Sequence, residues 1–109
     1  MVHSNLRLDH LNLPARDPIA LARWYSSTFD LLLDEHRARG EGMLLVFVPG
    51  EPITREHDFH VGFRVPSNDA LSQWARKFDV EVRTGAEFNT FRTYDPEGNC
   101  IEIYCKKDS

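Results

Sequence analysis

The sequence repeats itself after fifty residues, and this internal repeat constrains the fold more than any other feature. A strand-borne histidine, a helix cap and an apolar helix stripe recur at the same spacing, whereas positions predicted to lie at the surface differ. Repetition of a whole strand-helix-strand unit predicts two similar modules. The identical pairs, which align without a gap, are His10 with His60, Ala20 with Ala70, Leu21 with Leu71 and Trp24 with Trp74.

Each repeat opens with a predicted strand followed by a predicted helix. Apolar and polar residues alternate over residues 6–13 and again over residues 59–65, which is typical of strands with one buried face. Pro14 is expected to end the first of these strands. Asp17 and Ser67 are the predicted N-caps of two helices, which end at Phe29 and at about Phe78.

Further strands follow each helix, and the pattern as a whole predicts an α+β fold. The first module has only about twenty residues for its strands, so it is expected to be a strand short or compressed. A polar connector, residues 51–57, separates modules of about residues 6–50 and 57–105 within one domain of residues 1–109. The predicted strands after the helices are residues 31–37, 43–48, 80–84, 89–95 and 100–105.

Composition excludes several classes of protein. The 109 residues carry a formal net charge of -4, and no basic run is longer than Lys106–Lys107, so nucleic acid is not an expected partner. The longest apolar run, residues 43–48, is far shorter than the roughly 20 residues of a membrane span, and the polar N-terminus lacks the pattern of a signal peptide. Cys100 and Cys105 lie on opposite faces of one predicted strand and are not expected to pair, which fits a cytosolic protein.

Strand parity singles out three candidate metal ligands. Alternate residues of a strand face opposite ways, so His60 points away from the apolar face that packs under the helix, and His10 and Glu102 hold the same position in their own strands. Two imidazoles and a carboxylate form a ligand set for a divalent ion such as Fe(II), Mn, Ni or Zn, with positions left for substrate oxygens. A lone strand histidine is more often a plain polar side chain, but the joint occurrence of the three residues favours a metal site.

Five other side chains are candidates for binding or catalysis. Arg64 and Arg92 could bind an anionic or oxygen-rich substrate, although pairing with carboxylates is an equal alternative. Tyr94 and Tyr104 are candidate proton donors, although tyrosines in pockets more often pack and form hydrogen bonds. We assign Tyr94 and Arg92 to catalysis with the glutamate ligand, and Asn12, Arg64 and Tyr104 to substrate binding.

Three segments carry a resemblance to a known family. They are Leu-Asp-His-Leu-Asn-Leu at residues 8–13, His-Val-Gly-Phe-Arg-Val at residues 60–65, and Asp-Pro-Glu-Gly-Asn-Cys-Ile-Glu-Ile-Tyr at residues 95–104. With the Trp-Tyr pair of the first helix, they resemble the vicinal oxygen chelate superfamily. That group includes glyoxalase I, fosfomycin-resistance thiol transferases, extradiol dioxygenases, methylmalonyl-CoA epimerases and metal-free bleomycin-resistance binders. The third segment is the most specific part of the resemblance.

The resemblance implies two βαβββ modules whose strands curl into an open barrel around a metal ion. His10, His60 and Glu102 fall on the family's ligand positions. A divalent-metal-dependent lyase, isomerase, thiol transferase or dioxygenase acting on a small oxygen-rich substrate is the implied function. The alternative is a metal-free protein of the bleomycin-resistance type that binds a small molecule in the same cleft. The resemblance also implies a homodimer, in which the first module of one chain could complete the barrel of its partner.

Overall fold

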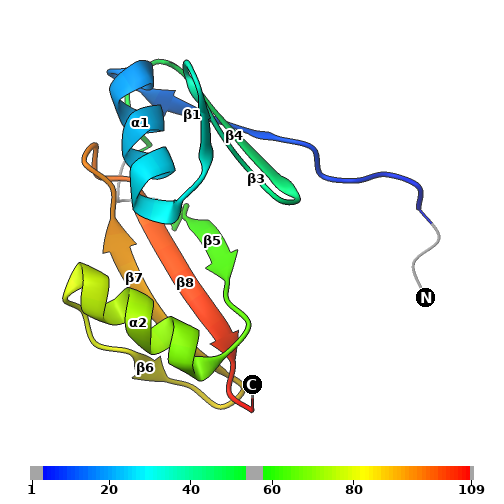
Figure 1. The fold of residues 1–109 in the computed structure, drawn as a ribbon, viewed down its shortest axis with the longest axis vertical. Coiled ribbons are helices and arrows are strands. Elements are labelled where there is room, and N and C mark those ends of the chain that lie inside the picture. The colour runs from blue at the N-terminus through cyan, green and yellow to red at the C-terminus, as the bar shows by residue number, and fades with distance from the viewer. Residues whose placement is uncertain (1–3, 54–57, 109) are drawn as a thin grey trace. The chain divides into compact units, whose positions relative to one another are not determined.

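A computed structural model describes residues 4–53 and 58–108, and its chain divides into two compact units. The first unit is Met1–Pro52 and the second is Ile53–Ser109 (Figure 1). Residues 54–57 of the predicted connector lie outside the described residues. In the described part of the chain, no helix is long and apolar enough to cross a membrane.

The first unit has the element order of a βαβββ module. Helix α1 (Pro18–Phe29) follows strand β1 (Leu11–Ala15), and three strands complete a mixed sheet of order β1-β4-β3-β2. Strand β1 pairs with β4 in parallel, and the other neighbours are antiparallel. The three later strands are β2 (Leu32–Asp34), β3 (Arg37–Gly40) and β4 (Met43–Pro49).

The second unit repeats this plan, as the internal repeat predicts. Its sheet has the order β5-β8-β7-β6, with β5 parallel to β8 and the other pairs antiparallel. The two βαβββ modules and the α+β class predicted from the sequence are confirmed. The elements are β5 (Val61–Arg64), α2 (Asn68–Phe78), β6 (Arg83–Thr84), β7 (Phe88–Tyr94) and β8 (Cys100–Lys106).

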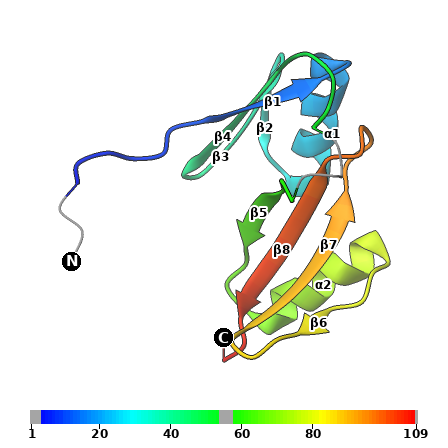
Figure 2. The same cartoon turned by 180° about the vertical axis from the view of Figure 1, so that it is seen from behind.

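Each helix covers one face of its own sheet, and the core of each unit lies between them. In the second unit, Figures 1 and 2 show α2 across one face of the sheet and no helix across the other. The ring of Tyr25 on α1 lies 5.1 Å from that of Phe47 on β4, and Phe78 on α2 lies 6.2 Å from Phe91 on β7, measured between centroids. Burying one such side chain stabilises the fold by about 1.5 to 3 kcal/mol.

The first strand begins later than its sequence pattern predicts. Its pairing with β4 starts at Leu11 opposite Leu45, so the preceding residues have no strand beside them. Leu6 and Leu8 are 85% and 89% exposed, and the prediction of a strand from residue 6 is therefore wrong. The strand also continues through Pro14, which is tolerated because β1 lies at the edge of the sheet.

A hairpin turn divides residues 31–37, which were predicted to form one strand. Strands β2 and β3 pair antiparallel, with Asp34 opposite Arg37, and the turn residue Glu35 has a left-handed backbone with φ 54°. The turn has neither the glycine nor the asparagine that normally announces such a hairpin. The first module is thus compressed rather than a strand short.

Candidate functional site

The face of the second sheet that α2 leaves uncovered gathers most of the predicted site residues. In the strand pairing, Gly62 lies opposite Glu102 and Arg64 opposite Tyr104, while Arg92 pairs with Glu102 from the other side. Paired residues point to the same face of a sheet, so these side chains share one surface, which we call the open face. The intervening residues Ile101 and Ile103 are buried, which confirms the parity predicted for β8, and Phe91 on β7 is buried as well.

His60 and Glu102 meet on this open face. The imidazole Nε2 lies 3.2 Å from Glu102 Oε1, and both side chains are about a quarter exposed, at 26% and 23%. The other carboxylate oxygen, Oε2, accepts a hydrogen bond of 2.7 Å from the Thr90 hydroxyl. Two adjacent oxygen and nitrogen donors are therefore held in place, with open space beside them: a Cβ added at Gly62 would have no atom within 4 Å.

Asp58, an acidic residue just before β5, lies close to both Arg92 and His60. Asp58 accepts a hydrogen bond of 3.2 Å from Arg92 Nη1, and its Oδ1 atom lies 3.8 Å from His60 Nδ1. The Asp58 carboxylate raises the pKa of the Arg92 guanidinium above its ordinary value. Arg92 Nε also lies 4.0 Å from Glu102 Oε2, so the arginine bridges two carboxylates at this end of the open face.

The turn before β8 fixes where Glu102 lies along its strand. Asp95 and Asn99 are buried, and Asp95 Oδ1 accepts hydrogen bonds from the backbone amides of Glu97 and Asn99. Gly98 has φ 89°, a conformation that glycine adopts without the steric cost borne by other residues. The Asp-Pro-Glu-Gly-Asn turn therefore anchors the start of the strand that carries the glutamate.

Two of the predicted site residues belong to the first unit. His10 precedes β1, is exposed, and has its Nδ1 atom 2.9 Å from Asp9 Oδ2, while Asn12 is an exposed residue of β1. Asn12 pairs with Val46, whereas its repeat counterpart Gly62 pairs with Glu102. The first unit thus repeats the histidine but has valine at the position of the carboxylate.

The two histidines differ in what lies at Nδ1. His10 Nδ1 is within hydrogen-bond distance of Asp9 Oδ2, at 2.9 Å, whereas Asp58 Oδ1 is 3.8 Å from His60 Nδ1, which is buried and has no hydrogen-bond partner among the described residues. Two ligand atoms bound at about 2.1 Å and at right angles lie about 3 Å apart, so the 3.2 Å between His60 and Glu102 suits a shared ion. Among residues 4–53 and 58–108, however, no group of three or more His, Cys, Asp or Glu side chains is placed to hold one.

Sequence reasoning missed two residues of this site. Thr90 lies two positions before Arg92 on the same face of β7, so strand parity alone could have identified it. Asp58 falls between the predicted connector, residues 51–57, and the predicted strand from residue 59, and no periodicity marks it. Tyr94 pairs with Cys100 on the open face, and neither Cys100 nor the buried Cys105 forms a disulfide.

No protein-family model and no curated protein matches the chain. Solved structures do match it over nearly its full length. A glyoxalase/bleomycin resistance protein/dioxygenase from Alicyclobacillus acidocaldarius is similar with a TM-score of 0.71 and 23% identity, covering 99% of this chain and 96% of that chain. A possible glyoxalase from Bacillus cereus is similar with a TM-score of 0.69 and 25% identity, covering 88% and 96%.

Proteins with more distant sequences share the architecture as well. A lactoylglutathione lyase from Agrobacterium tumefaciens has a TM-score of 0.67 at 13% identity, covering 94% of this chain and 95% of that chain. A fosfomycin resistance protein from Listeria monocytogenes has a TM-score of 0.66 at 16% identity, covering 96% and 94%. One architecture therefore serves proteins of different activities, and the site must decide the chemistry.

Proposed function

We propose that this chain, which has the fold of the vicinal oxygen chelate superfamily, binds a divalent metal ion that holds two oxygen atoms of a small substrate. The resemblance in its sequence is confirmed at the level of the fold by the solved structures that it matches. The observation that carries the proposal is the 3.2 Å contact between His60 Nε2 and Glu102 Oε1 on the open face.

Three residues of the chain are the proposed ligands. His60 and Glu102 supply one nitrogen and one oxygen, and Thr90 holds the carboxylate in position through its hydroxyl. His10, the repeat counterpart of His60, is the proposed third ligand, contributed by the same chain or by a second copy. A divalent ion with this donor set would supply Lewis acidity, with Fe(II), Mn, Ni and Zn as candidates.

The neighbouring side chains have roles that follow from their chemistry. Arg92 brings a fixed positive charge to the rim of the site, where it would stabilise negative charge that develops on a substrate oxygen. Tyr94 lies on the same face of β7 and carries a phenol that could donate a proton to substrate. Lyase, isomerase, thiol transferase and dioxygenase reactions all begin with a substrate held through its oxygens, and the proposal covers this group.

Metal binding is the first prediction, and it can be measured without knowing the substrate. Purified protein is loaded in turn with Mn, Fe(II), Ni or Zn, and affinity and stoichiometry are measured by calorimetry and elemental analysis. Replacing Glu102 with Gln removes a charged ligand atom while keeping its shape. We expect affinity to fall more than about 100-fold, because changes outside the ligands themselves already cost about 10- to 100-fold.

Matched variants separate this effect from a general loss of charge or of histidine. Glu81→Gln removes an exposed carboxylate elsewhere in the second unit, and His36→Asn removes an imidazole from the β2–β3 turn. Both are expected to retain wild-type metal affinity. If Glu102→Gln binds metal as well as the wild type, Glu102 is not a ligand and the proposed centre is wrong. If the wild type binds none of the four ions, the metal-free small-molecule binder takes its place.

A further inference from the structure

The open face of the second unit carries two cations at the end away from the turn before β8. Arg64 is exposed at the end of β5, and Lys106 is exposed at the end of β8. Neither side chain has an ion-pair partner among the residues that the structure describes. This differs from Arg92, whose charge is balanced by Asp58, and it is notable in a chain with a net charge of -4.

Strand register places these two cations within reach of one ligand group. Arg64 pairs with Tyr104, and Lys106 lies two residues further along β8 on the same face. With a rise of about 3.3 Å per residue and strands about 4.8 Å apart, their Cα atoms are about 8 Å apart. Two long, flexible cationic side chains at that spacing can both contact a single carboxylate or phosphate.

Aromatic rings lie beside the two cations, because Tyr104 pairs with Arg64 and Phe88 pairs with Lys106. The rings of Phe88 and Tyr104 meet edge to face with their centroids 5.6 Å apart, and Phe88 is 41% exposed. On the open face, Gly62 is the one residue of β5 between Arg64 and His60, which precedes the strand. Because glycine has no side chain, the surface beside Glu102 is clear. A flat molecule could therefore lie along the strands without displacing any side chain.

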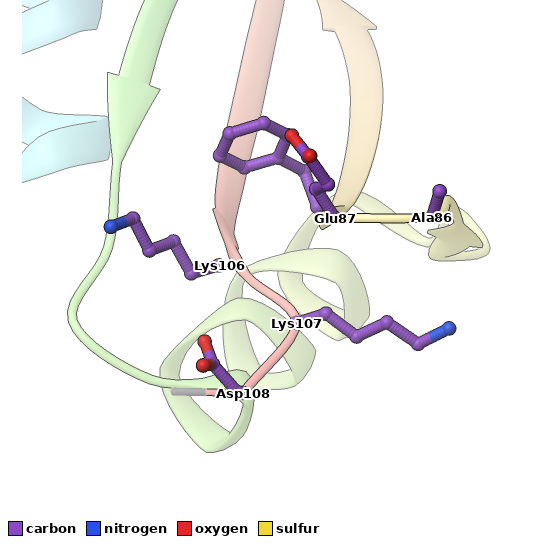
Figure 3. A pocket seen from close by; sticks show the side chains of 6 residues that line it. Ala86, Glu87, Lys106, Lys107 and Asp108 are labelled. Atoms are coloured by element: carbon purple, nitrogen blue, oxygen red, sulfur yellow. The ribbon is translucent and has the colours of Figure 1, made fainter.

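A hollow of about 490 Å³ lies at this end of the sheet, within the usual size range for small-molecule sites. Phe88 and Lys106 of the open face line it together with Ala86, Glu87, Lys107 and Asp108, so its two lysines share it with two carboxylates. Figure 3 shows Lys106 and Lys107 extending from the chain in opposite directions. Lys107 Nζ donates to the carbonyl of Gly85, so Lys106 is the lysine left to meet a ligand on the open face.

We propose that the substrate is a flat molecule with chelating oxygens at one end and an anionic group at the other. The oxygens lie at His60 and Glu102, the body lies along β8 over Tyr104, whose ring packs against Phe88, and a carboxylate or phosphate lies between Arg64 and Lys106. Along β8 the anionic group is about 7 to 13 Å from the chelating end. This inference rests on the proposed function for its chelating end, whereas its anionic end stands on the unpaired cations.

A pair of catechols that differ in one carboxylate group tests this proposal. Dihydrocaffeate has a chelating catechol and a propionate tail, and 4-propylcatechol has the same ring and three-carbon chain with a methyl group in place of the carboxylate. Dissociation constants for both are measured by calorimetry on metal-free and on Mn-loaded protein. We expect dihydrocaffeate to bind about tenfold more tightly, since two charge-assisted hydrogen bonds are gained.

Variants then assign the preference to its residues. The double variant Arg64→Gln with Lys106→Gln is expected to bring the ratio of the two constants to about one, with propylcatechol affinity unchanged. Arg83→Gln is the control, because Arg83 lies on the same face but on β6, about 10 Å across the sheet from Tyr104. Thermal unfolding checks that each variant folds.

The outcomes separate this inference from the proposed function. Equal binding of the two catechols by wild-type protein overturns the anionic end, whatever the metal measurements give. If the wild-type protein binds no metal but still prefers dihydrocaffeate tenfold, the metal centre is overturned and the anionic end is supported. A preference that survives the double variant but disappears in Arg83→Gln overturns the assignment to Arg64 and Lys106.

Discussion

At the scale of single residues, the site depends on a threonine that touches no ligand. The Thr90 hydroxyl lies 2.7 Å from Glu102 Oε2, so it fixes one carboxylate oxygen and leaves Oε1 toward His60. A hydrogen bond to a ligating carboxylate both orients it and limits its rotation. Thr90 is thus a positioning residue for Glu102.

Removal of this hydroxyl is expected to weaken metal binding without unfolding the chain. Thr90→Val keeps the shape of the side chain but loses the donor, and we expect metal affinity to fall about tenfold. Thr90→Ser retains the donor and should restore affinity to near the wild-type value. Thr93→Val is the control, because Thr93 pairs with Ile101 and faces the other side of the sheet. Equal losses in the Thr90→Val and Thr93→Val variants would contradict the positioning role.

Residue parity explains how much of the site the sequence could predict. Alternation with buried isoleucines placed Glu102 on the open face, and the same rule would have placed Thr90 there. Asp58 could not be found this way, because it precedes β5 and has no strand periodicity. Contacts made by chain outside regular elements depend on tertiary structure that a local pattern does not encode.

At the scale of elements, the first and last residues of both helices were predictable, but the left-handed backbone that follows each helix was not. The side chains of Asp17 and Ser67 accept hydrogen bonds from the amides of Ala20 and Ala70, as their N-cap positions predict. Both helices end at an aspartate in the left-handed conformation, Asp30 with φ 56° and Asp79 with φ 55°. Glycine normally occupies such a position, so an aspartate there does not predict the left-handed backbone, although the last helical residues, Phe29 and Phe78, lie where the apolar pattern predicts them. The missed turn at Glu35 has the same cause.

The left-handed backbone at the end of α2 predicts which of two Asp79 variants is the more stable. Asp79→Gly and Asp79→Ala remove the same charge, but alanine bears the steric cost of a positive φ and glycine does not. We expect the glycine variant to be more stable than the alanine variant by about 1 kcal/mol in urea unfolding. At Asp69, in the first turn of α2, the same pair should show the opposite order. If the same variant, glycine or alanine, is the more stable at both positions, the left-handed backbone assigned to Asp79 is contradicted.

At the scale of the whole molecule, the two repeated modules differ in the candidate ligand side chains that they carry. The open-face position that holds Glu102 in the second module is occupied by Val46 in the first, whereas the histidine is present in both. The repeat therefore predicted the architecture from a few helix and strand positions, because these have structural roles in each copy. It also predicts that a complete site needs both kinds of module, two ligands from one and His10 from the other.

The last prediction concerns which chain supplies His10. The family resemblance leads us to expect a homodimer in light scattering, with His10 of one copy serving the His60 and Glu102 of the other. His10→Ala and Glu102→Ala variants should each bind metal poorly. When they are mixed and allowed to exchange subunits, a mixed dimer has one site that retains both residues and one that lacks both. Metal content should then recover to about a quarter of the wild-type value at equal mixing and random exchange.

If the ligands instead come from one chain, every site in the mixture lacks one of them, and metal content stays at the level of the separate variants while the dimer persists. A monomer in light scattering would likewise require His10 to act within its own chain.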